Sequence, residues 1–164
     1  MSPSLRIRGF SMIELLMVIA IIGVLAAVVL ASFGSARNKG VDSTVKANLD
    51  GTRPQAELYY VANGNSYTGV CATVPAANVK TINSFAVAAQ QAYNGSTAIN
   101  TTYATAGSAN TATCHVSTAT GAGTWALEAP LKVVSGSFFC VDSFGYAATT
   151  SGSTLGANDT TCGP

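Results

Sequence analysis

Charged side chains are scarce in this sequence of 164 residues. Asp, Glu, Lys and Arg make up 9% of the chain, against roughly 25% in an average soluble protein. Between Ala62 and Pro164 the charged residues are Lys80, Glu128, Lys132, Asp142 and Asp159, and Ala, Ser, Thr, Gly and Asn dominate that stretch. The formal net charge of +1 indicates neither a nucleic-acid partner nor an acidic one. A surface solvated by hydroxyl and amide groups favours an exported protein instead.

Motifs for catalysis and metal binding are also missing. The sequence has no G-x-S-x-G, no H-E-x-x-H, no phosphate-binding glycine loop and no C-x-x-C pair, and its single histidine is His115. Zinc sites need closely spaced Cys and His pairs. We therefore expect no catalytic residue, no cofactor and no metal site, and predict that the protein is not an enzyme. His115 is interpreted as a polar residue on a strand face, and Glu128 and Asp142 as solvated charges on strands.

Four cysteines lie beyond residue 70, at Cys71, Cys114, Cys140 and Cys162. An even number of cysteines in an exported domain predicts two disulfides, and therefore an oxidising compartment. The cysteine count leaves three pairings open.

The longest apolar run lies at the amino terminus. Residues 1–9 are basic through Arg6 and Arg8, and residues 10–31 are apolar except for Ser11 and Glu14. As a helix, residues 10–30 span roughly 30 Å, the thickness of a hydrocarbon core. The flanking arginines place the amino end in the cytoplasm and send the rest outward.

Three ordinary explanations of this run fit Glu14 poorly. A plain membrane anchor gives the carboxylate no role, although a charge at the centre of an apolar span costs on the order of 2–3 kcal/mol. A signal peptide cleaved after Ala31 would have an apolar region longer than the usual length of about 7–15 residues. A buried helix of a soluble protein fits least well.

The letters G-F-S-M-I-E at residues 9–14, followed by the apolar run, resemble the type IV prepilin signature. In that family a dedicated peptidase cuts after the glycine, and the new amino-terminal residue is commonly N-methylated. The resemblance implies that Gly9 ends the leader, that Phe10 is the methylated amino terminus, and that Glu14 pairs with such an amine to set the register between subunits. Many family members carry a proline where this chain has Ala31, so the sequence departs from the family there.

Helical periodicity continues beyond the apolar run. Apolar positions that step by three or four residues predict one face of an amphipathic helix. This face consists of Val41, Val45, Leu49, Thr52, Ala56 and Tyr59, and the polar face of Arg37, Lys39, Lys46, Asp50 and Arg53. Pro54 lacks the backbone donor that a helix interior needs, so a kink or break is expected near residues 50–54.

Beyond residue 62 the sequence predicts a small antiparallel sheet. Ser84 is expected to cap a short helix closed by Asn94 and Gly95. Strands are predicted at residues 111–118, 123–128, 130–134 and 137–142, with a tight hairpin at 134–137 and a turn at 142–145. Residues 96–110 are interpreted as loop or weak strand, and the tail from 146 to Pro164 as loop. The predicted fold class is α+β, with a long amino-terminal helix packed on a small antiparallel β-sheet, which the resemblance identifies as the type IV pilin fold.

The resemblance divides the chain into a leader at residues 1–9, a transmembrane and filament-core helix at 10–32, an amphipathic helix half at 33–62 and a β-rich head at 63–164. It also favours the disulfide Cys140–Cys162, which is similar to the disulfide that closes the family's carboxyl-terminal loop. The remaining pair is then Cys71–Cys114.

The function that the resemblance implies is that of a structural subunit of an extracellular filament. The chain would be made as a precursor in the inner membrane, cleaved after Gly9 and polymerised through its apolar helix into a filament on the cell surface. Expected partners are further copies of the chain, the prepilin peptidase and the assembly machinery of the inner membrane. Two alternatives stay open: a pseudopilin of a type II secretion system, and a secreted, disulfide-stapled binding module.

Overall fold

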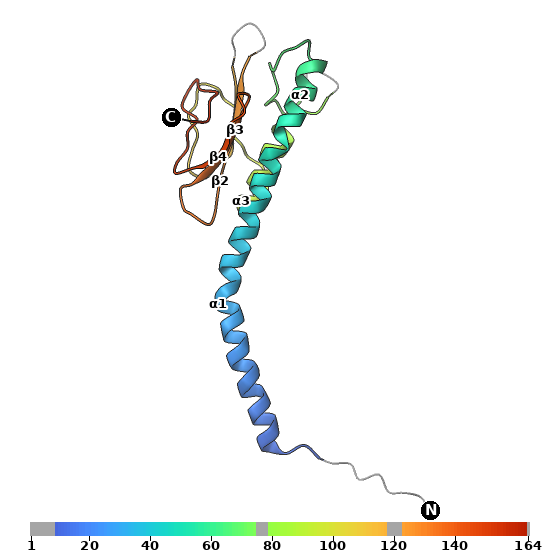
Figure 1. Ribbon diagram of the computed structural model, residues 1–164, viewed down its shortest axis with the longest axis vertical. Coiled ribbons are helices and arrows are strands. Elements are labelled where there is room, and N and C mark those ends of the chain that lie inside the picture. The colour runs from blue at the N-terminus through green and yellow to red at the C-terminus, as the bar shows by residue number, and fades with distance from the viewer. Residues whose placement is uncertain (1–8, 75–78, 118–122, 164) are drawn as a thin grey trace, which may run out of the picture. The chain divides into compact units, whose positions relative to one another are not determined.

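The computed structural model describes residues 9–74, 79–117 and 123–163, apart from the side chain of Ala31 (Figure 1). The chain divides into two compact units, residues 1–37 and 38–164, and we call the second the head unit. The helices are α1 (Met12–Asp50), α2 (Thr52–Ala62) and α3 (Asn83–Asn94), and the strands are β1 (Thr113–Val116), β2 (Trp125–Pro130), β3 (Phe138–Asp142) and β4 (Ala147–Thr150). The strands form one antiparallel sheet in chain order. The predicted α+β fold, with a long helix and a small antiparallel sheet, is confirmed.

The face of α1 and α2 that packs in the head unit is the one that the periodicity predicts. Val45, Leu49, Ala56 and Tyr59 are fully buried in the main core, and Val41 is half-buried against it. The apolar stripe of residues 41–59 packs on the apolar face of the sheet, and this packing holds the helices in the head unit.

A single residue separates α1 from α2. Gly51 has helical backbone angles (φ −67°, ψ −14°), and its N–H donates to the Ala47 carbonyl at 3.2 Å. Pro54 has no N–H to donate to the carbonyl of Asp50, so α1 ends at Asp50 and Pro54 lies in the first turn of α2, where proline is tolerated. The break expected near residues 50–54 is confirmed.

Strands β2 and β3 of the sheet are buried on both faces. Trp125, Leu127 and Ala129 of β2 face the main core with the helices, whereas Ala126 of the same strand belongs to a second core formed with Cys140, Leu155 and Cys162. Disulfides Cys71–Cys114 and Cys140–Cys162 join Cα atoms 5.8 and 5.7 Å apart, which is the pairing favoured from the sequence. Each core therefore contains one disulfide.

Trp125 marks the centre of the main core. It is the single tryptophan of the chain and 1% exposed, and the ring of Tyr67 lies edge-on to it at 6.5 Å. Tyr67 donates a hydrogen bond of 2.6 Å to Glu57. Burial, together with this bond, raises the pKa of the Tyr67 hydroxyl above its ordinary value. The phenol therefore stays protonated, and keeps its role as a donor, to a higher pH than an exposed tyrosine would.

The prediction of a strand at residues 130–134 is wrong. β2 continues through Pro130, and residues 131–137 form a loop before β3. The reason is Asp42, a buried carboxylate on α1 that accepts hydrogen bonds from the Lys132 and Val133 N–H groups at 2.6 and 3.1 Å. Donors that bind a side chain are not available to a strand. The tight turn expected at residues 134–137 is present, closed by the Ser137 N–H and the Val134 carbonyl.

Other boundaries also differ from the prediction. The residues read as a loop after the turn at 142–145 contain β4, which pairs with β3. β1 and β2 begin later than predicted, at Thr113 and Trp125, and residue 118 lies outside the described residues. The position before α3 is Ile82 and not Ser84, whose hydroxyl instead donates to the Thr81 carbonyl. Gly95 ends α3 with φ +80°, as expected for a left-handed cap.

The polar residues read as solvated are buried. Glu128 is fully buried and accepts hydrogen bonds from the Ser153 hydroxyl and from the Thr154 N–H at 2.9 Å. Asp142 is 4% exposed and accepts from the Cys162 N–H at 3.0 Å. The His115 ring is also fully buried, with its two nitrogens 2.8 and 2.9 Å from the carbonyl oxygens of Asp159 and Thr105. The loops lack the regular backbone hydrogen bonds of a sheet. These side chains bond backbone groups of the loops instead, because buried backbone groups need partners.

Removing the second disulfide is expected to free the end of the chain. In a Cys140→Ser/Cys162→Ser variant we expect the free energy of unfolding to fall by about 3 kcal/mol, and residues 156–163 to become the first site of cleavage. Glu128 should still hold residues 153–155. Chemical denaturation and limited digestion with a nonspecific protease, followed by mass mapping, measure both effects. First cleavage inside β1 to β3 would contradict this prediction.

Candidate assembly site

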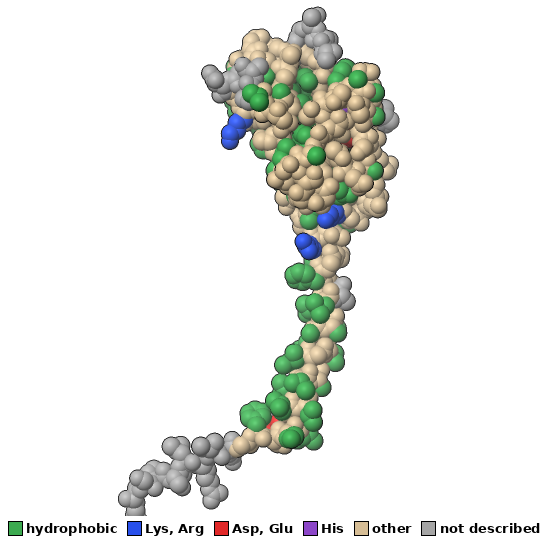
Figure 2. Space-filling view, turned by 180° about the vertical axis from the view of Figure 1, so that it is seen from behind, with side chains coloured by type: hydrophobic (Ala, Val, Ile, Leu, Met, Phe, Trp, Pro, Cys, Tyr) green, Lys and Arg blue, Asp and Glu red, His purple; other side chains and the backbone are tan. Residues whose placement is uncertain are grey.

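The amino-terminal part of α1 exposes its apolar side chains on every side. Large apolar residues between Phe10 and Phe33 are 47–85% exposed, and Figure 2 shows hydrophobic side chains along the visible side of this part of the helix. One window of 18 residues has a mean hydropathy of 3.0, and none of it is buried. By length and composition the helix is able to cross a membrane. An apolar surface of this extent needs a membrane or other protein surfaces to cover it.

Glu14 is the acidic residue in the first turn of this helix. Its Oε2 accepts a hydrogen bond of 3.0 Å from the N–H of Ser11, the residue before the first helical position. Ser11 in turn offers its carbonyl to the Glu14 and Leu15 N–H groups at 3.1 and 3.3 Å. This is half of a capping box, in which a glutamate at the third helical position reaches back to the capping residue.

The capping contact uses one side of the carboxylate. Among the residues that the structure describes, Ser11 supplies the hydrogen bond that Glu14 accepts. The other carboxylate oxygen, Oε1, thus keeps capacity for a cation or a donor from outside the chain. An acidic side chain is also favourable in the first turn of a helix, since backbone N–H groups point toward it.

Gly9 and Phe10 lie before the helix in an exposed stretch. Phe10 is 82% exposed, and a Cβ built on Gly9 would meet nothing within 4 Å. Gly9 therefore packs against none of the residues that the structure describes. α1 also runs without interruption past Ala31, where many members of the resembled family have proline.

From Gly9 to Phe33, the described residues include no set of side chains that could carry out covalent chemistry. Among the described residues, no group of three His, Cys, Asp or Glu side chains is placed to hold a metal ion. This segment can bury apolar surface, which contributes about 1.5–3 kcal/mol for each large aliphatic side chain fully covered. It also places one carboxylate at a fixed position within that apolar surface. The sequence contained a signal for the cap that our reading missed, namely the S-x-x-E spacing of Ser11 and Glu14.

Comparisons with known proteins agree with this arrangement. Residues 5–30 match the family described as the prokaryotic N-terminal methylation motif. The chain is 32% identical over 127 residues to the type IV wide pilus major component PilA4 of Thermus thermophilus, covering 77% of this chain and 85% of that protein. No solved structure matches.

Proposed function

Because this chain belongs to the type IV pilin family and is a structural subunit of a pilus filament at the cell surface, we propose how it is made and assembled. It is made as a membrane-anchored precursor and cleaved after Gly9. Residues 10–32 then pack it into the filament. The observation that carries this proposal is an apolar helix exposed on every side that contains one carboxylate. Neither a soluble protein nor a simple anchor explains that combination.

The apolar segment supplies the driving force for assembly in this proposal. In the precursor, lipid covers the segment, and in the filament the same segment of neighbouring copies covers it. Exchange of lipid for protein leaves the apolar area covered throughout, so a subunit never exposes the segment to water. The inner-membrane assembly machinery would provide the work of extraction.

Glu14 supplies the register in this proposal. Cleavage after Gly9 creates a cationic amine at Phe10, and the Glu14 carboxylate of a neighbouring copy would meet it among apolar side chains. A charge pair in such surroundings specifies one alignment, because any other alignment leaves two charges buried without partners.

Cleavage after Gly9 assigns a role to a glycine that the fold itself does not require. The prepilin peptidase would need close access to the backbone, which a residue without Cβ permits. We also propose that the chain is the major subunit, since the Thermus relative is a major pilus component.

The amino terminus of the mature protein tests the proposal directly. Filaments sheared from cells should contain the chain, and its amino-terminal residue should be N-methylated Phe10 when sequenced by mass spectrometry. A mature chain that begins at Ser32 and is recovered from the medium would indicate a secreted module instead. A filament in which this chain is a trace component would contradict the major role alone.

A further inference from the structure

The sheet of the head unit has one covered edge and one open edge. At β1, the segment around Asn100 covers the edge: the Asn100 N–H donates to the Ala112 carbonyl at 2.9 Å, and the Cys114 N–H donates to the Asn100 carbonyl at 2.8 Å. β4 is the last strand on the other side. Unpaired edges template pairing with another chain, and proteins usually cover or charge them.

The register shows which backbone groups of β4 face away from the sheet. The Asp142 N–H donates to the Tyr146 carbonyl, so this pair is hydrogen-bonded, and bonded pairs alternate with non-bonded pairs along an antiparallel ladder. The pairs Cys140–Ala148 and Phe138–Thr150 are therefore bonded, whereas Val141–Ala147 and Phe139–Thr149 are not. The N–H and C=O groups of Ala147 and Thr149 consequently point outward.

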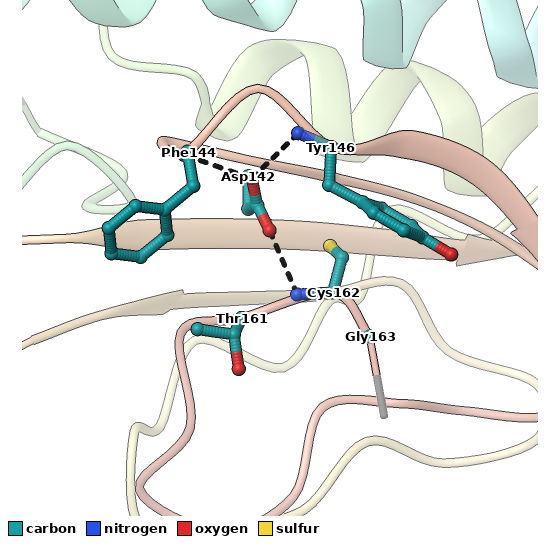
Figure 3. Close-up of a pocket in the computed structure, with 6 residues that line it drawn as sticks. All are labelled: Asp142, Phe144, Tyr146, Thr161, Cys162 and Gly163. Carbon is teal, nitrogen blue, oxygen red and sulfur yellow. Dashed lines mark hydrogen bonds between the residues drawn. The ribbon is translucent and has the colours of Figure 1, made fainter.

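These outward groups are accessible. Ala147 and Thr149 are the two exposed residues of the strand, and among the described residues no hydrogen bond to their backbone groups is found. A hollow of about 420 Å³ borders the strand at Thr149 and Thr150. It shares Tyr146 and Gly163 with a second hollow beside Asp142 and Cys162 (Figure 3).

β4 and residues 151–158, which follow it, carry no charged residue, although Arg53 of α2 donates a hydrogen bond to the Tyr146 carbonyl directly before the strand. Residues 143–158 contain no Asp, Glu, Lys or Arg, and Figure 2 shows few basic side chains on the visible face of the head unit. The strand from Ala147 to Thr150 itself thus lacks the charged side chains, proline and bulge by which exposed edges are normally blocked.

We infer that the β4 edge, through the backbone groups of Ala147 and Thr149, binds an extended segment of the next copy in the filament. This inference rests on the proposed function, which supplies copies at a fixed spacing. With two residues available, the contact is too small to join free subunits and becomes effective when the apolar helices already hold neighbours together. The segment that pairs is not another β4, because two-fold pairing would close on itself and stop a growing filament.

Hydrogen exchange tests the inference without any substitution. Amide exchange at Ala147 and Thr149 is compared between subunits in detergent and filaments that contain this chain alone. We expect both amides to exchange at least about tenfold more slowly in the filament. Equal exchange in the two states would overturn the inference while leaving the proposed function intact, whereas failure of the chain to enter filaments would contradict the proposed function.

A proline variant provides an independent test. Thr149→Pro removes an outward N–H without removing a bond to β3, and proline is tolerated at such edge positions. We expect its filaments to break under shear that leaves the parent filaments whole. Ser135→Pro is the control, since Ser135 lies at the second position of a turn whose third residue is Gly136 with φ +79°, a place that suits proline. Equal shear resistance of Thr149→Pro and Ser135→Pro would overturn the inference, and hydrogen exchange decides alone if Thr149→Pro fails to fold.

Discussion

Replacement of Glu14 by Gln is expected to reduce the yield of filaments on the order of a hundredfold, the effect of leaving one charge of a buried pair without its partner. The amide oxygen of Gln still accepts the hydrogen bond from the Ser11 N–H, so the helix cap is retained while the charge is lost. Membrane insertion and processing should be unchanged. Counting filaments by electron microscopy and quantifying sheared protein measure the yield, with membrane levels of the mature chain as the reference.

Glu14→Ala serves as the matched variant, because it removes both the charge and the cap. If the charge sets the register, Gln and Ala variants assemble equally poorly. If Glu14 acts through the cap alone, the Gln variant assembles normally and the Ala variant does not, and the registry role is wrong. The capping hydrogen bond of 3.0 Å is what makes this separation possible.

Replacement of Gly9 by Val is expected to stop cleavage and therefore assembly. Among the described residues, a Cβ at this position meets nothing within 4 Å, so we expect the fold to tolerate valine. The effect then arises from the peptidase that must approach the backbone. The precursor should accumulate in the membrane with the nine leader residues still attached. Intact-mass measurement of the membrane fraction distinguishes the two forms.

Gly9→Ala is the graded control for steric exclusion, and we expect it to be cleaved more slowly than the parent and faster than Gly9→Val. Mature-length protein in the Gly9→Val variant would show that cleavage occurs elsewhere. Head-unit stability should be the same in all three chains, because Gly9 lies outside the head unit.

The parts of the fold that could be predicted are those where a local pattern determines the structure. The helical face around Val45 and Leu49 follows from a 3.6-residue period, which differs from the two-residue period of a strand. The break before Pro54 follows from one missing donor. The apolar run likewise predicted a helix long and apolar enough to cross a membrane, whereas the role of Glu14 in assembly stays a prediction.

The parts that were missed depend on contacts far apart in the sequence. Nothing near residues 130–134 reveals that Asp42, about 90 positions earlier, takes two of their N–H groups and prevents a strand. Glu128 and Asp142 were read as solvated because their partners include the backbone N–H groups of Thr154 and Cys162, and a backbone group carries no side-chain signal. β4 consists of Ala and Thr and lacks the apolar pattern that strands usually show. Its pairing with β3, which the sequence does not reveal, makes it a strand.

The position of Trp125 makes the head unit optically distinguishable from the apolar segment between Phe10 and Phe33. Trp125 is the single indole of the chain, and the segment from Phe10 to Phe33 contains neither Trp nor Tyr. Fluorescence emission excited at the indole band therefore reports the packing around β2 and is blind to the apolar helix. A subunit variant that fails to assemble but keeps the emission of a buried indole has an intact head unit. An emission shift to longer wavelength identifies a chain whose head unit has opened, with no label attached.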